Sequence, residues 1–218
     1  MSRRTLSERA PIPAVSPVRS QASFATERAE RQRERILDAA ELCFIQSGFH
    51  AASMVHIAQT ADMSAGLIYR YFDSKSAIVK AIIERHLESD LHKMIGRLNN
   101  AEDVSRIVLQ IFDSWRCRDD PKMNPILMLE LAAESTRDPK IARAVRSKDQ
   151  AIRATLAQSM RRSAQSRGVK LTAATARSRG VMLQCLVEGL ALRVVRDPKL
   201  RRSALQPALD SIITVLMS

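Results

Sequence analysis

SMVHIAQTADMSAGLIYRYF, residues 53–72, is the stretch of sequence that decides the fold. Ser53 and Ser64 each precede a short run with apolar residues three and four apart, which is the pattern of a capped helix that buries one face. Residues 61–63 lie between the two runs and leave room for a tight turn. Two short helices joined in this way predict a helix-turn-helix, in which the second helix is presented to DNA.

The apolar residues of this stretch predict how the two helices pack. Met63 fills the turn, and Phe72 with either Leu67 or Ile68 packs the second helix back onto the first. Asp62 stands in the turn, where aspartate can adopt the left-handed conformation at a modest cost. The residues of the first helix that face the core are Ile57, Ala58 and Ala61.

The exposed face of the second helix has the properties of a surface that enters a DNA groove. It starts with the small residues Ala65 and Gly66, which let the helix N-terminus approach the major groove closely. Tyr69, Tyr71 and Lys75 follow and supply hydroxyl and ammonium donors for phosphates. The face has few hydrogen-bonding side chains for base edges, so we expect readout through backbone groups and DNA shape.

Residues 31–90 resemble the DNA-binding domain of the tetracycline-repressor (TetR) family. The residue types and their spacing along the chain both match over about 60 residues. The matching residues are Ile36-Leu37-Asp-Ala-Ala40, Phe44, Gly48-Phe49, Ser53, Ile57-Ala58, then Gly66, Tyr69, Phe72 and Lys75. The departure is Asp62, because the family usually has glycine in the turn. Residues 91–218 resemble the family's effector domain more loosely, with Leu186-Val-Glu-Gly-Leu190 similar to its penultimate dimer helix.

The resemblance implies a role for individual residues. Ser53 matches a cap residue that meets a phosphate, Leu67 matches a position facing base edges together with the two small residues before it, and Arg70 falls where contacts vary. The complete set predicted to bind DNA is Ser53, Met54, Ser64, Ala65, Gly66, Leu67, Tyr69, Arg70, Tyr71 and Lys75.

Outward from this motif, the rest of the chain is predicted to be helical. No segment alternates polar and apolar residues over the length of a strand, so the fold class is all-α with about nine helices. The expected helices cover 26–48, 53–61, 64–72, 74–98, 103–115, 126–135, 139–168, 172–195 and 203 onward, with Pro207 in the first turn of the last. We divide the chain into a disordered arm (1–26), a DNA-binding domain (27–90) and an effector-binding and dimerisation domain (91–218).

The positive charge is concentrated away from the helix-turn-helix. The 218 residues have a formal net charge of +12, which favours an anionic partner. Residues 1–90 nevertheless have a net charge of +1, whereas 137–202 hold 17 Lys and Arg against 4 Asp and Glu. Three interpretations of that basic run stay open: a solvated surface, added attraction for DNA, or a site for an anionic effector such as an acyl-CoA or an acidic metabolite.

Several classes of protein are excluded by what the sequence does not contain. Cys43, Cys117 and Cys185 lie far apart in apolar surroundings, which predicts core residues in a reducing cytoplasm rather than disulfides or a zinc site. We find no secretory signal and no bilayer-spanning stretch. Phosphate-binding glycine loops, HExxH, GxSxG and paired carboxylates are also missing. We therefore expect a cytoplasmic protein that is not an enzyme and uses no cofactor or metal.

The last two helices are predicted to form a dimer seam. Residues 181–195 are apolar nearly all round, which indicates burial both in the chain's own bundle and against a second subunit. The family resemblance implies a four-helix seam, and a two-fold dimer would present two recognition helices about 34–36 Å apart to a palindromic operator. The predicted seam residues are Gly180, Val187, Gly189, Leu190, Ala191, Leu209, Ile212, Ile213 and Leu216.

A pocket for a small inducer is implied by the same resemblance. Methionine and aromatic side chains suit an adaptable apolar site, and ordinary core packing is the alternative for each of them. The candidates are Ile111, Phe112, Trp115, Met123, Met128, Leu131, Met160 and Leu183.

Together these features predict a homodimeric transcriptional regulator that binds double-stranded DNA, a repressor released by a small molecule. The long helix expected from Ser74 to Leu98 would connect the two halves. Two alternatives stay open: an activator or architectural DNA binder of the same fold, and a helical interaction module that does not bind DNA.

Overall fold

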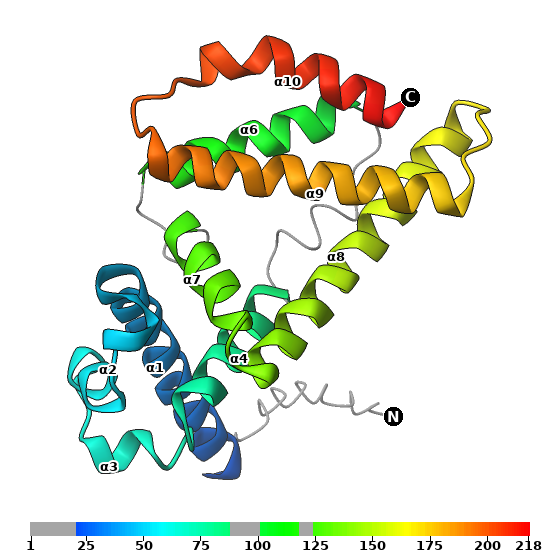
Figure 1. The fold of residues 1–218 in the computed structure, drawn as a ribbon. Helices are drawn as coiled ribbons and strands as arrows, with labels where there is room; N and C mark the ends of the chain where they lie inside the picture. The colour runs from blue at the N-terminus through cyan, green and yellow to red at the C-terminus, as the bar shows by residue number, and fades with distance from the viewer. Residues whose placement is uncertain (1–20, 88–100, 118–123) are drawn as a thin grey trace, which may run out of the picture.

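The computed structural model describes residues 21–87, 101–117 and 124–218, and within these ranges it consists of nine helices and no strand (Figure 1). The all-α prediction is confirmed. The helices are α1 (Gln21–Ala51), α2 (Met54–Thr60), α3 (Ala65–Ile68), α4 (Lys75–Leu87), α6 (Ala101–Cys117), α7 (Pro125–Ser135), α8 (Pro139–Ser166), α9 (Ala173–Arg196) and α10 (Arg202–Met217).

Local capping signals determine most of these boundaries. The side chains of Asn124, Asp138 and Thr172 accept hydrogen bonds from backbone N–H groups in the first turns of α7, α8 and α9. Proline follows the cap directly in α7 and α8, where the missing N–H costs no helical hydrogen bond. Gly48 and Gly168 have φ of 75° and 74°, a conformation that other residues rarely adopt. Gly168 follows the end of α8, whereas Gly48 marks a kink inside α1, which continues to Ala51 beyond the predicted end.

The structure corrects the predicted bounds at both ends of the chain. Helix α1 is already present at Gln21, where the described residues begin, rather than starting at Thr26. The disordered arm predicted for 1–26 is therefore wrong for 21–26, and its first 20 residues lie outside the described ranges. Pro207 is the sixth residue of α10, beyond the first turn, so it cannot donate to the carbonyl of Ser203. The second half of the helix predicted for 74–98 falls on residues that are not described.

Two hydrophobic clusters make up the core. The first contains side chains of α1–α4 together with Leu127, Leu131 and Ile141 from α7 and α8. The second joins α6, α8, α9 and α10 around Phe112 and Ile213, both 0% exposed. Figure 1 shows α1–α4 at one end, α6, α9 and α10 at the other, and α8 running between them. Helix α8 therefore belongs to both cores.

Candidate DNA-binding interface

Helices α2 and α3 form the predicted helix-turn-helix. The hydroxyl of Ser53 accepts the N–H of His56 at 3.0 Å, and that of Ser64 accepts the N–H of Leu67 at 3.2 Å. Asp62 has φ of 52°, so aspartate does occupy the left-handed position expected of it. Serine caps and one left-handed residue thus build the turn from local signals alone.

Burial decides which residues hold the two helices together. Ile57, Ala58 and Ala61 are buried as predicted. On the second helix Ile68 is 0% exposed and Phe72 4%, whereas Leu67 is half-buried. Ile68 is therefore the core residue of the predicted pair, which leaves Leu67 at the edge of the exposed face.

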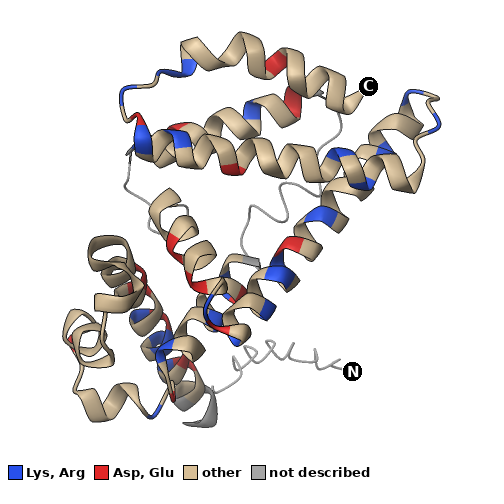
Figure 2. Cartoon of the chain, viewed as in Figure 1, with Lys and Arg blue, Asp and Glu red and all other residues tan. Residues whose placement is uncertain are grey.

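The outer face of α3 is small, open and almost uncharged. Ser64, Ala65 and Gly66 are exposed, and a Cβ added to Gly66 would meet no other atom within 4 Å. Tyr69 is 50% exposed, and Arg70 beside it is exposed too. Figure 2 shows few charged residues on α2 and α3. This face can approach a groove closely, with Tyr69 and Arg70 at its rim as donors.

Ser53 and Met54 lie at the start of α2, the first exposed and the second half-buried. Tyr71 is half-buried and packs against the first core cluster, so its ring is less available to phosphate than that of Tyr69.

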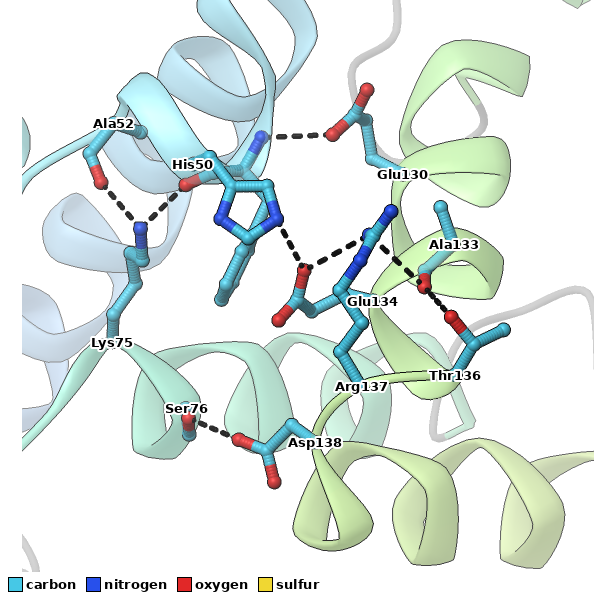
Figure 3. A network of polar contacts seen from close by, with 11 residues as sticks. His50, Ala52, Lys75, Ser76, Glu130, Ala133, Glu134, Thr136, Arg137 and Asp138 are labelled. Carbon is cyan, nitrogen blue, oxygen red and sulfur yellow. Dashed lines mark hydrogen bonds and ion pairs between the residues drawn. The ribbon is translucent and has the colours of Figure 1, made fainter.

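Lys75 is half-buried, and its ammonium binds backbone carbonyls of the protein itself, whereas the sequence predicts a contact with a DNA phosphate. Its Nζ donates to the carbonyls of Phe49 at 2.5 Å and Ala52 at 2.9 Å, and lies 4.2 Å from the centre of the Phe49 ring (Figure 3). Burial lowers the pKa of Lys75, although the nearby carboxylate of Glu134 opposes the shift. The ammonium thus caps the carboxyl end of α1.

Two arginines of α1 position the motif and are absent from the predicted site. Arg35 donates to the carbonyl of Ala61 at 2.7 Å, which ties the turn to α1. Arg33 donates to the carbonyl of Tyr71 at 3.2 Å and lies 4.4 Å from the centre of the Phe72 ring. In the sequence these two arginines differ from other residues only by their place on the polar side of α1. That signal is too weak to identify them as residues that position the motif.

Helix α7 and the start of α8 bind α1 and α4, the two helices that flank the helix-turn-helix, through acidic side chains (Figure 3). Glu130 accepts the N–H of Phe49 at 2.8 Å, and the buried Glu134 lies 3.3 Å from Nε2 of His50. Ser76, in the first turn of α4, donates to Asp138 at 2.6 Å. This bond is the largest cause of a lowered pKa at Asp138. Side chains far from the motif in the sequence therefore hold the two helices that flank it.

A second polar cluster joins α1 to α4. Glu41 is 0% exposed, is hydrogen-bonded to Nε2 of His86 at 2.8 Å and forms an ion pair with Arg85, whose Nη2 lies 2.7 Å from the same carboxylate oxygen. Arg85 also bonds Glu34 and Asp38 at 2.8 and 2.7 Å. Burial alone would raise the pKa of Glu41, but the hydrogen bonds from His86 and Arg85 outweigh it, so its pKa is lowered.

The predicted seam residues on α9 and α10 divide into two groups. Five are buried in the protomer's own core, because α9 and α10 pack on α6 and α8 through this side: Gly180, Leu190, Ala191, Leu209 and Ile213. Val187 and Leu216 are half-buried, and Gly189 and Ile212 are exposed. The outward side also carries Met182 at 56% and Val215 at 69% exposure, an apolar surface that the sequence analysis did not single out.

Cys185 lies on this same outward side of α9 and is exposed, so its prediction as a core residue is wrong. Cys43 is buried as predicted, and the side chain of Cys117 is outside the described part.

Most of the predicted pocket residues belong to the hydrophobic core. Ile111, Phe112, Trp115, Met160 and Leu183 are buried together in the second core cluster, with Met128 packed against them. Leu131 belongs to the first cluster, and Met123 lies outside the described ranges. Nε1 of Trp115 is buried without a hydrogen-bond partner among the described residues.

Metal sites and membrane-spanning helices are both absent from the described part of the chain. No group of three His, Cys, Asp or Glu side chains there is placed to hold a metal ion. No described helix is long and apolar enough to cross a membrane.

Two family models match the sequence. The model described as "Bacterial regulatory proteins, tetR family" matches residues 36–82, and that described as "BetI-type transcriptional repressor, C-terminal" matches residues 100–217. Among characterised relatives, the HTH-type transcriptional regulator UidR of Escherichia coli is 33% identical over 140 residues, which cover 64% of this chain and 69% of UidR.

Solved structures share the architecture over most of its length. Salmonella enterica GusR superimposes with a TM-score of 0.69 and 26% identity, covering 86% of this chain and 95% of GusR. The transcriptional regulator FadR from Bacillus subtilis, in complex with stearoyl-CoA, has a TM-score of 0.66. It covers 83% of this chain and 97% of FadR, and at 20% identity it shows the fold alone.

Proposed function

The chain belongs to the TetR family of DNA-binding transcriptional regulators, and from this premise we propose that it is a homodimeric repressor which a small molecule releases from a palindromic operator. The observation that carries the proposal is the outer face of α3. Gly66, which the fold does not require to be glycine, stands on this face where the helix would come closest to DNA. The exposed side chains of Tyr69 and Arg70 lie beside it. Such a surface suits entry into a major groove with phosphate contacts at its rim.

We further propose the division of labour between the two ends of the molecule. Residues 27–90 bind DNA, and 91–218 bind the effector and form the dimer. The outward apolar side of α9 and α10, with Met182, Gly189, Ile212 and Val215, is the proposed seam. Because the proposed target of the protein is DNA, we place its action in the cytoplasm.

The proposed release depends on α7 and α8, which contact both ends of the molecule. Glu130 bonds the end of α1 and Asp138 bonds the start of α4, while α8 also packs in the core with α9. A ligand that favours another arrangement of α7 or α8 would change the orientation of α3, and hence the distance between the two recognition helices of a dimer.

The test is fluorescence anisotropy on DNA from upstream of the protein's own gene, beside a scrambled duplex, at about 50 and 200 mM salt. Tight binding to the upstream duplex alone, which survives the higher salt, supports the proposal. Tyr69→Ala should weaken that binding while far-UV circular dichroism stays unchanged, because the side chain is half exposed. Equal, salt-sensitive binding to both duplexes would mean that this DNA holds no operator, and selection of genomic fragments would then decide whether α3 reads any sequence.

A further inference from the structure

A groove of about 750 Å³ lies between the second half of α8 and the start of α9. Its polar wall is basic, and no carboxylate lines it. Figure 2 shows Lys and Arg along α8 and in the loop that leads to α9. The groove's cationic side chains are Arg161, Arg162, Lys170 and Arg177, and its apolar ones include Ala157 and Leu171.

The charge of this region is one-sided over a long stretch of chain. Residues 150–187 contain seven Lys and Arg and no Asp or Glu. Arg167 is used within the fold, because it donates to the carbonyl of Met217 at the end of α10. Arg161, Lys170 and Arg177 are exposed and form no ion pair with any described residue. Three cations thus line one hollow without an ion pair to any carboxylate in the described part of the chain.

The groove is also lined by apolar side chains. Small residues on both helices, including Ala154 and Ala173, belong to its lining. Val169, which is 44% exposed, lines it too. A groove that combines apolar side chains with several cations is complementary to a molecule with an anionic head and a hydrocarbon part, since a concave site can remove the hydrocarbon from water while the cations pair with the head.

The position of the groove separates it from operator binding. Arg161 is 22 residues beyond the start of α8, about 33 Å along the helix, and that start is the end which contacts α4. The proposed DNA-binding face on α3 lies at the other end of the molecule (Figure 1). A duplex held by α3 leaves these cations free for another anion.

We propose that this groove binds an anionic amphiphile, a molecule with one phosphate or carboxylate head and an alkyl chain, and that this ligand is the effector. The proposal rests on the proposed function as a ligand-released repressor. The ligand would contact α8 directly, and α8 reaches the helix-turn-helix end through Asp138.

Isothermal titration calorimetry with dodecyl phosphate, below its micellar concentration, tests the site. Wild type should bind it at least tenfold more tightly than inorganic phosphate or dodecyltrimethylammonium. Arg161→Gln and Arg177→Gln should each weaken binding by about tenfold, equivalent to about 1.4 kcal/mol. Arg143→Gln and Arg146→Gln remove the same charge from exposed positions in the first half of α8 and should leave the affinity unchanged.

Anisotropy on operator DNA then tests the role of the ligand. Dodecyl phosphate should release wild type from the operator, and the two groove variants should bind the operator normally but need about ten times more ligand for release. Unchanged calorimetric affinity in the groove variants, or loss of affinity in Trp115→Phe instead, would overturn the site. Ligand binding without release would overturn the effector role. Failure of every protein to bind any operator would contradict the proposed function while leaving the calorimetric result on the groove intact.

Two other anions give distinguishable outcomes. A groove that binds vesicles of phosphatidylglycerol but not monomeric dodecyl phosphate is a membrane contact, which would overturn the proposal. Weaker binding of Arg161→Gln and Arg177→Gln to a scrambled duplex, with Arg143→Gln unaffected, would assign the groove to DNA and overturn it as well.

Discussion

Replacement of Gly66 by alanine should stabilise the protein and weaken its binding to DNA. Gly66 is the second residue of α3 and has no positive φ, so alanine fits the backbone as it stands. The new Cβ would meet no protein atom within 4 Å, so no clash offsets the gain in helix propensity. That gain is about 0.5–1 kcal/mol, which raises the melting temperature of a chain of this size by roughly 1–4 °C.

The same methyl group stands on the face that we propose enters the groove. It keeps the α3 backbone from its closest approach to the bases, and we expect at least a tenfold loss of operator affinity, or about 1.4 kcal/mol. Gly66→Leu should lose more affinity and still fold. Thermal unfolding and anisotropy on one preparation measure both effects. Unchanged affinity in a stabilised Gly66→Ala would refute the close approach, and a less stable variant would refute the open surroundings of this residue.

Three further predictions follow from buried or exposed groups. Lys75→Met should lower the free energy of unfolding by about 1–3 kcal/mol in urea titrations, because two carbonyls lose their donor; a loss of DNA affinity at full stability would instead make Lys75 a phosphate contact. The folded-state pKa of Glu41 is lowered, so its stabilisation is present above the usual carboxyl pKa of 4.5 and is lost as the pH falls below it. Glu41→Gln should therefore be less stable than wild type at pH 7 but should show a smaller further loss during acid titration, and parallel acid titration curves would contradict the shift. Gly189→Arg should weaken dimerisation and operator binding together, and sedimentation like that of wild type would argue against the seam.

The helices and the helix-turn-helix could be predicted because their signals are local. A serine cap, a glycine at a helix end and apolar residues three and four apart all act within a few residues of the feature they predict. Ser53, Ser64 and Gly168 therefore identify helix ends correctly. Pro207 is the exception, because packing of α10 on α6 continues the helix through a residue that disfavours it.

The contacts between distant segments could not be predicted in the same way. Glu130 bonds Phe49 across 81 positions, and nothing near either residue indicates the pairing. Lys75 matches the spacing of a phosphate contact, yet its direction depends on two carbonyls contributed by the end of α1. Cys185 has apolar neighbours in the sequence, but the core takes only one side of α9. The run of positive charge was visible in the sequence, whereas its convergence on a hollow requires α8 and α9 side by side.

The hydrogen bond between Glu130 and Phe49 has a free energy similar to the coupling that the proposed release requires. A full switch from 1:99 to 99:1 needs about 5.5 kcal/mol, while coupling between two binding sites typically amounts to about 1–3 kcal/mol. A hydrogen bond from a backbone N–H to a partly buried carboxylate contributes about 1.5–3 kcal/mol, so breaking this one bond accounts for a tenfold to hundredfold change in operator affinity. Glu130 is on α7, which packs on α8, and Phe49 is on α1, which packs on α2, so a ligand on α8 can act on α3 by way of α7, α1 and α2.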